Sequence, residues 1–365
     1  AQRLGEALRP RPDLRCIPNL DPVEIMPDQP ILDQLAPRTL LPSHQRSRRG
    51  FNQTFARTAE QTIAAMDAGG HDIPNQEARL PLRLRRVGLS RSSIPVRLAD
   101  PLGGSGTVEL SCDVDAFVDL AAERRGIHVS RIGDLLARLA GETYSSLSHY
   151  AVRVHDELRA VQASDTATAA VRGVLTYLEA VRGVKNKSSL EHLDLAAEAV
   201  TRDGAATIAQ SVGFTHITAC PCVQETYRNS FGPEQEALRR AAAESRMPLL
   251  THSQRCRTRI TIAGAEEPLP LDSLVACIDQ VVVRSQNTLP REFELLNVHR
   301  SHAKPQFLED VVRELTYGVY KLIARDHPKA TIRIRSSSME SIHDFDLEGE
   351  IEYTVAELDR IFSDS

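Results

Sequence analysis

The order of predicted strands and helices occurs twice along the chain, and this repeat constrains the fold more than any single motif. In the first half, predicted strands precede a pair of helices and two strands follow; the strands span residues 80–85, 94–98, 107–120, 169–180 and 193–200. In the second half, one strand precedes two helices and two strands follow; the strands span residues 258–262, 330–335 and 348–353. Such an order is typical of an α+β fold with antiparallel sheets. A Rossmann fold is excluded, because neither strand–helix alternation nor a Gly-x-Gly-x-x-Gly motif is present.

Four helices complete the repeat. Ser130 is a suitable N-cap for a helix that carries Leu135, Leu136 and Leu139, and a second helix is predicted at 147–161. In the second half, helices are predicted at 271–283 and from Pro305 to residue 323, with proline at the first helical position.

The chain of 365 residues is long enough for two domain-sized units with their own cores. Residues 1–71 differ from the rest, because prolines are frequent and apolar periodicity is weak outside a short helix predicted at 54–68. We therefore expect a partly ordered or helical N-terminal extension at 1–71, a first unit at 72–218 and a second unit at 219–365.

Composition excludes several classes of protein. The net charge of −5, with both signs spread along the chain, argues against a nucleic-acid protein and leaves room for a local basic pocket that binds a polyanionic small molecule. No apolar run reaches about 18 residues and no secretory signal is found, so we expect a cytoplasmic protein without a membrane segment. Six cysteines in so long a chain indicate reduced thiols.

Two short motifs could form a metal site. Cys220-Pro221-Cys222 is followed by Thr251-His252-Ser253-Gln254-Arg255, and a thiolate with an imidazole suits a borderline-soft divalent ion. Two buried thiols with an unrelated surface histidine is the other interpretation of this spacing.

Several motifs together resemble the type IB GTP cyclohydrolases, including their archaeal branch, over about residues 72–358. The motifs are Val87-Gly88-Leu89, Arg125-Gly126-Ile127-His128-Val129-Ser130-Arg131, Thr218-Ala219-Cys220-Pro221-Cys222, Thr251-His252-Ser253-Gln254-Arg255, Pro305-Gln306-Phe307-Leu308-Glu309-Asp310 and Glu340-Ser341-Ile342-His343. The resemblance implies a tunnelling fold with tandem units, a homotetramer around an antiparallel barrel, and GTP as substrate.

The resemblance also implies the metal ligands Cys220, His252 and Glu294, which leave one position open for a water. A Cys/His/Glu set accepts Fe(II), Zn or Mn, with one ion per subunit. The family usually has Lys-Arg-Pro-Asp-Glu where this chain has Pro290-Arg291-Glu292-Phe293-Glu294, and Asn where it has Ser253. The alternatives are a loop imidazole bonded to a carbonyl for His252 and a solvated carboxylate for Glu294.

Three further residues receive catalytic or substrate roles from the resemblance. Cys222 would orient the substrate or move a proton, and His343 would transfer a proton or add a ligand. Glu309 would accept hydrogen bonds from N1–H and the 2-amino group of guanine. The alternatives are a buried inert thiol, a histidine at a strand end, and an ordinary first-turn glutamate.

Phosphate binding is predicted for His128, Ser130 and Arg131 at a helix N-terminus, with Arg255 adding charge from another edge. The alternative is a capping segment with a solvated arginine. In the family such residues often come from a neighbouring subunit, so activity would require the oligomer.

The leading prediction is a metal-dependent GTP cyclohydrolase that opens the guanine imidazole ring, releases formate and forms a 7,8-dihydroneopterin triphosphate or cyclic phosphate. One alternative is a diverged homologue that stops at a ring-opened formamidopyrimidine or uses another purine nucleotide. The other is a non-catalytic metal-binding oligomer.

Overall fold

The computed structural model describes residues 72–181, 187–202, 204–229, 236–237, 240, 244, 248–249 and 251–363. The chain separates into two units, Ala1–His71 and Asp72–Ser365, and the description below concerns the second. The helix predicted at 54–68 lies outside the described residues. No helix in the described part of the chain is both long and apolar enough to cross a membrane.

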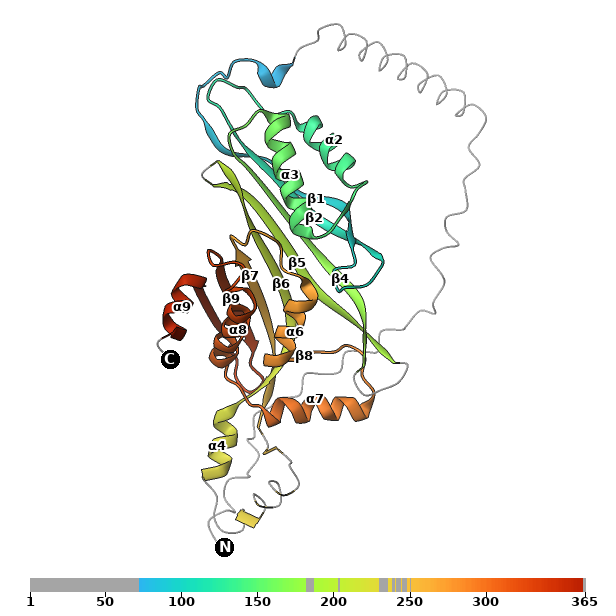
Figure 1. The fold of residues 1–365 in the computed structure, drawn as a ribbon, viewed down its shortest axis with the longest axis vertical. Coiled ribbons are helices and arrows are strands. Elements are labelled where there is room, and N and C mark those ends of the chain that lie inside the picture. The colour runs from blue at the N-terminus through green and yellow to red at the C-terminus, as the bar shows by residue number, and fades with distance from the viewer. Residues whose placement is uncertain are drawn as a thin grey trace, which may run out of the picture. The chain divides into compact units, whose positions relative to one another are not determined.

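One ten-stranded sheet forms the centre of the second unit, with the order β10-β9-β7-β6-β5-β4-β2-β1-β3 and β8 paired with β6 (Figure 1). The strands are β1 (Leu84–Ala99), β2 (Thr107–Leu120), β3 (Thr143–Tyr144), β4 (Ala167–Ala180), β5 (Ser188–Arg202), β6 (Ala205–Ala219), β7 (Ser253–Ala263), β8 (Val283–Arg284), β9 (Thr331–Met339) and β10 (Leu347–Thr354). Every pair is antiparallel except the short contact between β1 and β3.

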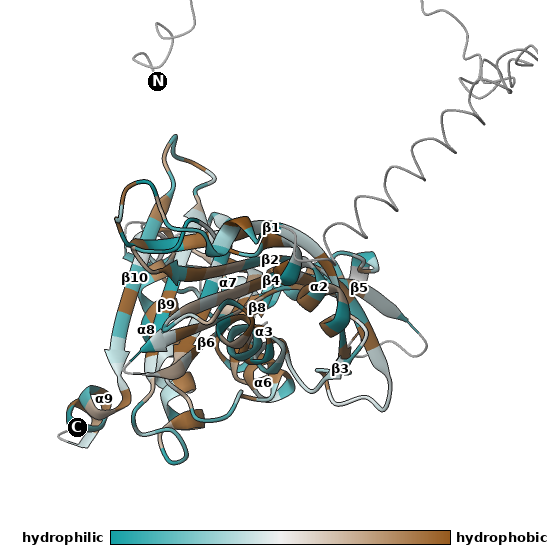
Figure 2. Ribbon diagram, turned by 90° about the horizontal axis from the view of Figure 1, so that it is seen from above, coloured by the Kyte–Doolittle hydropathy of each residue, from teal (hydrophilic) through white to brown (hydrophobic). Residues whose placement is uncertain are grey.

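Helices cover one face of this sheet (Figure 2). The covering helices are α2 (Val129–Leu139), α3 (Leu147–Gln162), α6 (Leu271–Val281) and α8 (Leu308–Ile323). The other described helices are α4 (Pro221–Asn229), α7 (Arg291–Ala303), α9 (Val355–Ser363) and a short 3₁₀ helix η2 (Ile73–Asn75). Alternate strand residues such as Leu195, Val212 and Ile260 face each other across neighbouring strands and pack with Leu158 of α3 and Leu315 of α8. Burial of this aliphatic row against the helices supplies the hydrophobic stabilisation of the fold.

The repeat expected from the sequence is present. The hairpin β1–β2, helices α2 and α3, and hairpin β4–β5 form the first set, and β6–β7, α6 and α8, and β9–β10 form the second. Gly204, with a φ of +83°, lies in the turn between the sets. The α+β fold with tandem units is therefore confirmed. The boundary predicted after residue 218 falls at the end of β6, which by this order belongs to the second set.

Several local predictions differ from the structure. Residues 84–99 form one strand rather than two, and a register shift between Leu89 and Ser92 contains Arg91, whose φ is 53°. The interruption of the apolar pattern there marks a bulge and not a hairpin turn. Helix α8 begins after Pro305, because Asp310 accepts the backbone N–H of the N-cap Phe307. Helices α4, α7 and α9 were not predicted.

Candidate functional site

The ends of β6 and β7 bring the two predicted metal motifs together. Ala219 and Ser253 form the last registered pair of the two strands. Beyond it, the N–H of Cys220 donates to the carbonyl of His252 at 3.0 Å, and the Thr251 hydroxyl donates to the carbonyl of Cys220 at 2.7 Å. Residues opposite each other in an antiparallel pair have Cβ atoms about 5 Å apart. Cys220 and His252 are thus immediate neighbours, although their motifs are well separated in the sequence.

The connection between β9 and β10 adds a third segment to this end of the sheet. The Ser341 hydroxyl lies 3.3 Å from Nδ1 of His252. His343 follows two positions later and is exposed, and its ring stacks on Phe345 with centroids 4.9 Å apart. The segment that carries His343 therefore contacts the Cys220–His252 pair through Ser341.

The start of α8 lies at the same end of the sheet. The backbone N–H of buried Gln306 donates to the carbonyl of Ala219 at 3.1 Å, directly before Cys220. Glu309 lies in the first turn of α8 and is exposed. A carboxylate in this position can accept hydrogen bonds from a ligand.

Glu294 lies on α7 and is exposed. The far end of α7 is tied to the site, because Nε2 of His302 lies 3.2 Å from the carbonyl of Thr251. Glu294 precedes His302 by about two helical turns, or about 12 Å along the axis. Over the described residues, no group of three or more His, Cys, Asp or Glu side chains could hold a metal ion. The single chain brings Cys220 and His252 together without Glu294, so the three-ligand set stays a prediction.

The two cysteines of the Cys-Pro-Cys motif have different environments. Cys220 is half-buried at the end of the ladder, whereas Cys222 is exposed in the first turn of α4. The interpretation of Cys222 as a buried thiol is therefore wrong, and its thiol is accessible to a ligand.

A row of buried polar side chains lies beneath the site and was not predicted. Its members occupy alternate positions of β6, β7 and β9: His216, Thr218, Cys256, Thr258, Ser336 and Ser338. Nε2 of His216 lies 2.8 Å from the Thr258 hydroxyl, which lies 2.7 Å from that of Ser336. Burial lowers the pKa of His216 to about 3 and raises the pKa of Cys256. The sequence signal was present as small polar residues in the inward positions of otherwise apolar strands.

On the opposite face of the sheet, β7 contributes Arg255 and Arg257 to a cavity of about 400 Å³, which we call the arginine basin. Residues of β5, β6 and the segment after β8 complete its lining, among them Asp194, Thr215 and Asn287. No described side chain forms an ion pair or side-chain hydrogen bond with either arginine. The predicted phosphate contact Arg255 therefore has donors available for an anion.

The first set of elements holds the other predicted phosphate contacts. His128 is the N-cap of α2, so the prediction of Ser130 as N-cap is wrong. The ring of buried His128 lies 3.4 Å from a carboxylate oxygen of Asp72 and 3.3 Å from the side-chain oxygen of Asn75, and Arg131 lies 3.7 Å from Asp72. The start of α2 and the Cys220 end of the sheet lie at opposite ends of this unit (Figure 1). One chain therefore does not bring His128, Ser130 and Arg131 to Cys220.

Comparisons with known proteins agree with the sequence motifs. The model of the family described as type I GTP cyclohydrolase folE2 matches residues 71–348. GTP cyclohydrolase MptA of Thermoplasma acidophilum is 25% identical over 296 residues, which cover 80% of this chain and 97% of the relative. GTP cyclohydrolase MptA 2 of Methanocella arvoryzae is 27% identical over 307 residues, which cover 79% and 97%.

Similar solved structures include two uricases. Uricase from Arthrobacter globiformis has a TM-score of 0.42 and 8% identity, with 74% of this chain and 92% of that chain covered. Uricase from Bacillus fastidious has a TM-score of 0.40 and 7% identity, with 76% and 96% covered. The family match extends over most of the described chain, including both motifs that meet at the ends of β6 and β7. The chain therefore belongs to the type I GTP cyclohydrolase folE2 family.

Proposed function

We propose that this protein is a GTP cyclohydrolase of the type IB branch. It hydrolyses the imidazole ring of guanine, releases formate and forms a 7,8-dihydroneopterin triphosphate or cyclic phosphate as a precursor in pterin biosynthesis. The observation that carries the proposal is the pairing of Cys220 and His252 at the end of the β6–β7 ladder, inside the segment that matches the family.

The donor set fits a divalent metal such as Fe(II), Zn or Mn, because a thiol and an imidazole lie next to each other just beyond the ends of two neighbouring strands. Cys220 and His252 would hold the ion, with Glu294 as third ligand. When bound, such an ion supplies an activated water near neutral pH. Glu294 completes the set only if α7 approaches Cys220 more closely than in the single chain, or if a second copy supplies it.

The remaining residues have roles that follow from their positions. Glu309 accepts the N–H groups of guanine at the start of α8, and Arg255 binds the phosphate chain. His343 and Cys222 are exposed beside the pair and serve in proton transfer and substrate orientation. His128, Ser130 and Arg131 bind phosphate from a neighbouring copy in a homo-oligomer, with a tetramer as the proposed assembly.

The test is anaerobic incubation of the full chain with GTP and Fe(II), Mn(II) or Zn(II). We expect formate and, after oxidation, pterin fluorescence. Cys220→Ser should abolish both and reduce the bound metal, whereas Cys277→Ser on α6 serves as the control and should retain both. A Cys220→Ser variant that is free of metal and fully active would exclude the mechanism.

A second function is favoured by the sequence at the third ligand. Glu292 and Phe293 stand where the family has Pro and Asp, next to Glu294. A homologue with this change could stop at a ring-opened formamidopyrimidine or act on another purine nucleotide. In the same assay, formate without pterin would indicate the truncated reaction, and neither product would indicate a binding protein.

A further inference from the structure

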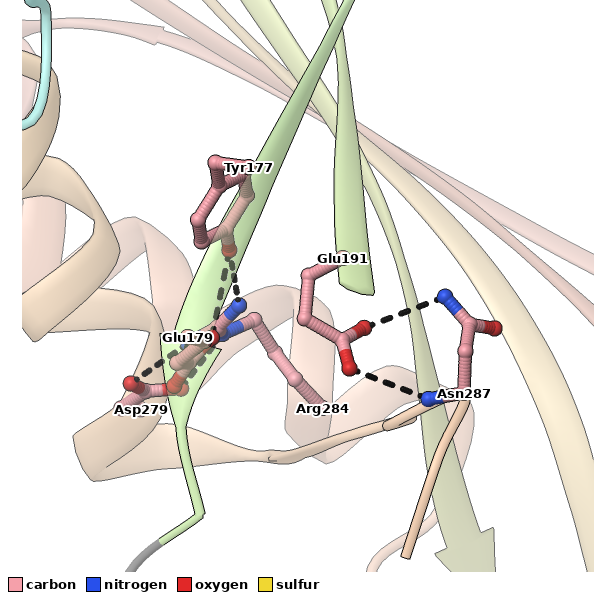
Figure 3. A network of polar contacts seen from close by, with 6 residues as sticks. All are labelled: Tyr177, Glu179, Glu191, Asp279, Arg284 and Asn287. Atoms are coloured by element: carbon pink, nitrogen blue, oxygen red, sulfur yellow. Dashed lines mark hydrogen bonds and ion pairs between the residues drawn. The ribbon is translucent and has the colours of Figure 1, made fainter. Parts of the chain in front are cut away.

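The segment that joins β8 to α7 is fixed by buried polar side chains of β5, although it has no regular structure itself. The two oxygens of Glu191 accept the backbone N–H of Asn287 at 3.0 Å and its side-chain amide at 3.3 Å (Figure 3). The Ser189 hydroxyl accepts the N–H of Thr288 at 2.8 Å. Glu191 is 3% exposed and Ser189 is fully buried.

Arg284, at the start of the same segment, joins three elements. Its guanidinium donates to Asp279 of α6 at 2.6 and 3.0 Å, to both oxygens of Glu179 of β4 at 3.0 Å, and to the Tyr177 hydroxyl at 2.8 Å (Figure 3). The arginine side chain is only 8% exposed. All three nitrogens of the guanidinium are therefore engaged, which fixes both the position and the orientation of β8.

Two cavities share Arg284 as a wall. One is the arginine basin, where Asn287 and Glu191 lie opposite the strand that carries Arg255 and Arg257. The other, of about 290 Å³, is lined by Phe293, Leu296, Asn297 and Arg300 of α7. A displacement of the segment would therefore change the width of the basin and the position of α7, which carries Glu294.

Burying a carboxylate is costly unless its oxygens are bonded, and an apolar side chain in its place is often no less stabilising. The buried Glu191 holds a loop rather than a core strand, so its benefit lies in fixing one position of that loop. We propose that Glu191, Asn287 and Arg284 form a latch of positioning residues that sets the basin and α7 for the reaction. This inference rests on the proposed function.

The test is a pair of exchanges at Glu191 and Asn287. Glu191→Gln replaces one acceptor by a donor that faces a donor, and Asn287→Asp places two carboxylates against each other. Each should lower kcat/KM for GTP by about 10- to 100-fold, the range found for groups that orient ligands or substrates.

In the double variant the amide introduced at position 191 donates to the carboxylate introduced at position 287. Glu191→Gln should therefore lower kcat/KM when it is introduced into the wild-type chain and raise it when it is introduced into the Asn287→Asp chain. Glu198→Gln, on an exposed position of β5, is the control.

Two readouts distinguish positioning from stability and from a failure of the proposed function. Activity is compared per folded molecule, and amide hydrogen exchange is followed across residues 285–300 and across β9 as reference. We expect faster exchange in 285–300 alone, a result that does not depend on GTP turnover. If the wild type lacks turnover but the single variants show this exchange pattern relative to it, the proposed function fails while the latch stands as a device that holds α7. Unchanged exchange in 285–300, or lower thermal stability with unchanged kcat and KM, would overturn the latch.

Discussion

At the residue scale, Glu309 is exposed and lies in the first turn of α8. Gln306, just before that turn, donates its backbone N–H to the carbonyl of Ala219, which precedes Cys220. As a carboxylate, the Glu309 side chain can accept two parallel N–H bonds. Guanine offers such a pair of donors at N1 and the 2-amino group, whereas adenine has an acceptor at N1. The position therefore suits selection of guanine over adenine.

Glu309→Gln should lower kcat/KM for GTP by about 10- to 100-fold, because one charged acceptor of a ligand hydrogen bond is replaced by an amide. Metal content and the circular dichroism spectrum should not change, since the side chain is exposed. The wild type should reject ATP in the same assay. Unaltered GTP turnover in the variant would show that the base is recognised elsewhere and would favour the alternative substrate.

Individual residues were predictable where a motif and the strand register agree. Cys220 and His252 were expected to meet, and the register of β6 and β7 places them opposite each other. The surroundings of Glu294 were not predictable, because they depend on the unpredicted helix α7 and on where its ends are attached. Among the described residues Arg255 and Arg257 have no side-chain partner, and this too depends on which carboxylates neighbouring strands supply, which no local pattern encodes.

The buried polar row of β6, β7 and β9 gives a prediction at the element scale. Burial lowers the pKa of His216 to about 3, so the unfolded chain takes up a proton at a higher pH than the folded chain. The contribution of His216 to the free energy of unfolding is fully present above pH 6.5, where the group is neutral in both states. It is lost as the pH falls toward 3, because the unfolded chain binds the proton first. Between pH 7 and pH 5, this one group lowers the free energy of unfolding by about 2 kcal/mol.

We therefore expect the urea midpoint of the wild type to fall more steeply from pH 7 to 5 than that of His216→Gln, which cannot take up this proton. Gln keeps a side-chain group that can bond Thr258, so the variant should still fold. Equal pH slopes for the two proteins would show that His216 is accessible to protons in the folded state.

Elements with strong periodicity were predicted well. Residues 107–120 alternate clearly and form β2 with those bounds. Strands were predicted at 80–85 and 94–98 where the structure has the single strand 84–99, because a bulge interrupts its weaker pattern. Helix α7 escaped prediction because it contains no marked apolar face: its outward positions include exposed Leu295, Leu296 and Val298. Such a helix depends on attachments at and before its ends, through Asn287 and Thr288 on one side and His302 on the other, which only the tertiary structure provides.

At the scale of the whole molecule, the two groups of predicted substrate contacts lie at opposite ends of the described unit (Figure 1). Cys220, His252 and Glu309 gather at the ends of β6 and β7, whereas His128 and Arg131 lie at the start of α2. A substrate of nucleotide size cannot contact both groups of one chain. If both groups bind GTP, each site contains the Cys220 group of one copy and the α2 group of another copy. Such sites form in a closed, symmetric oligomer, in which every copy contributes both groups.

Mixing two inactive variants tests this arrangement. Cys220→Ser leaves the α2 end intact, and Arg131→Ala, at a half-exposed side chain, leaves the Cys220 end intact. Each variant alone should be inactive or weak. After co-expression in equal amounts, random assembly gives about a quarter of sites with both groups intact, so about a quarter of wild-type activity should return.

The control is Cys220→Ser co-expressed with the Cys220→Ser/Arg131→Ala double variant, where no complete site can form. If each variant alone is inactive and the mixed oligomers recover no activity, Arg131 acts within the same chain's own site, because the intact halves would then never meet. An Arg131→Ala variant that is fully active alone would place Arg131 outside the site.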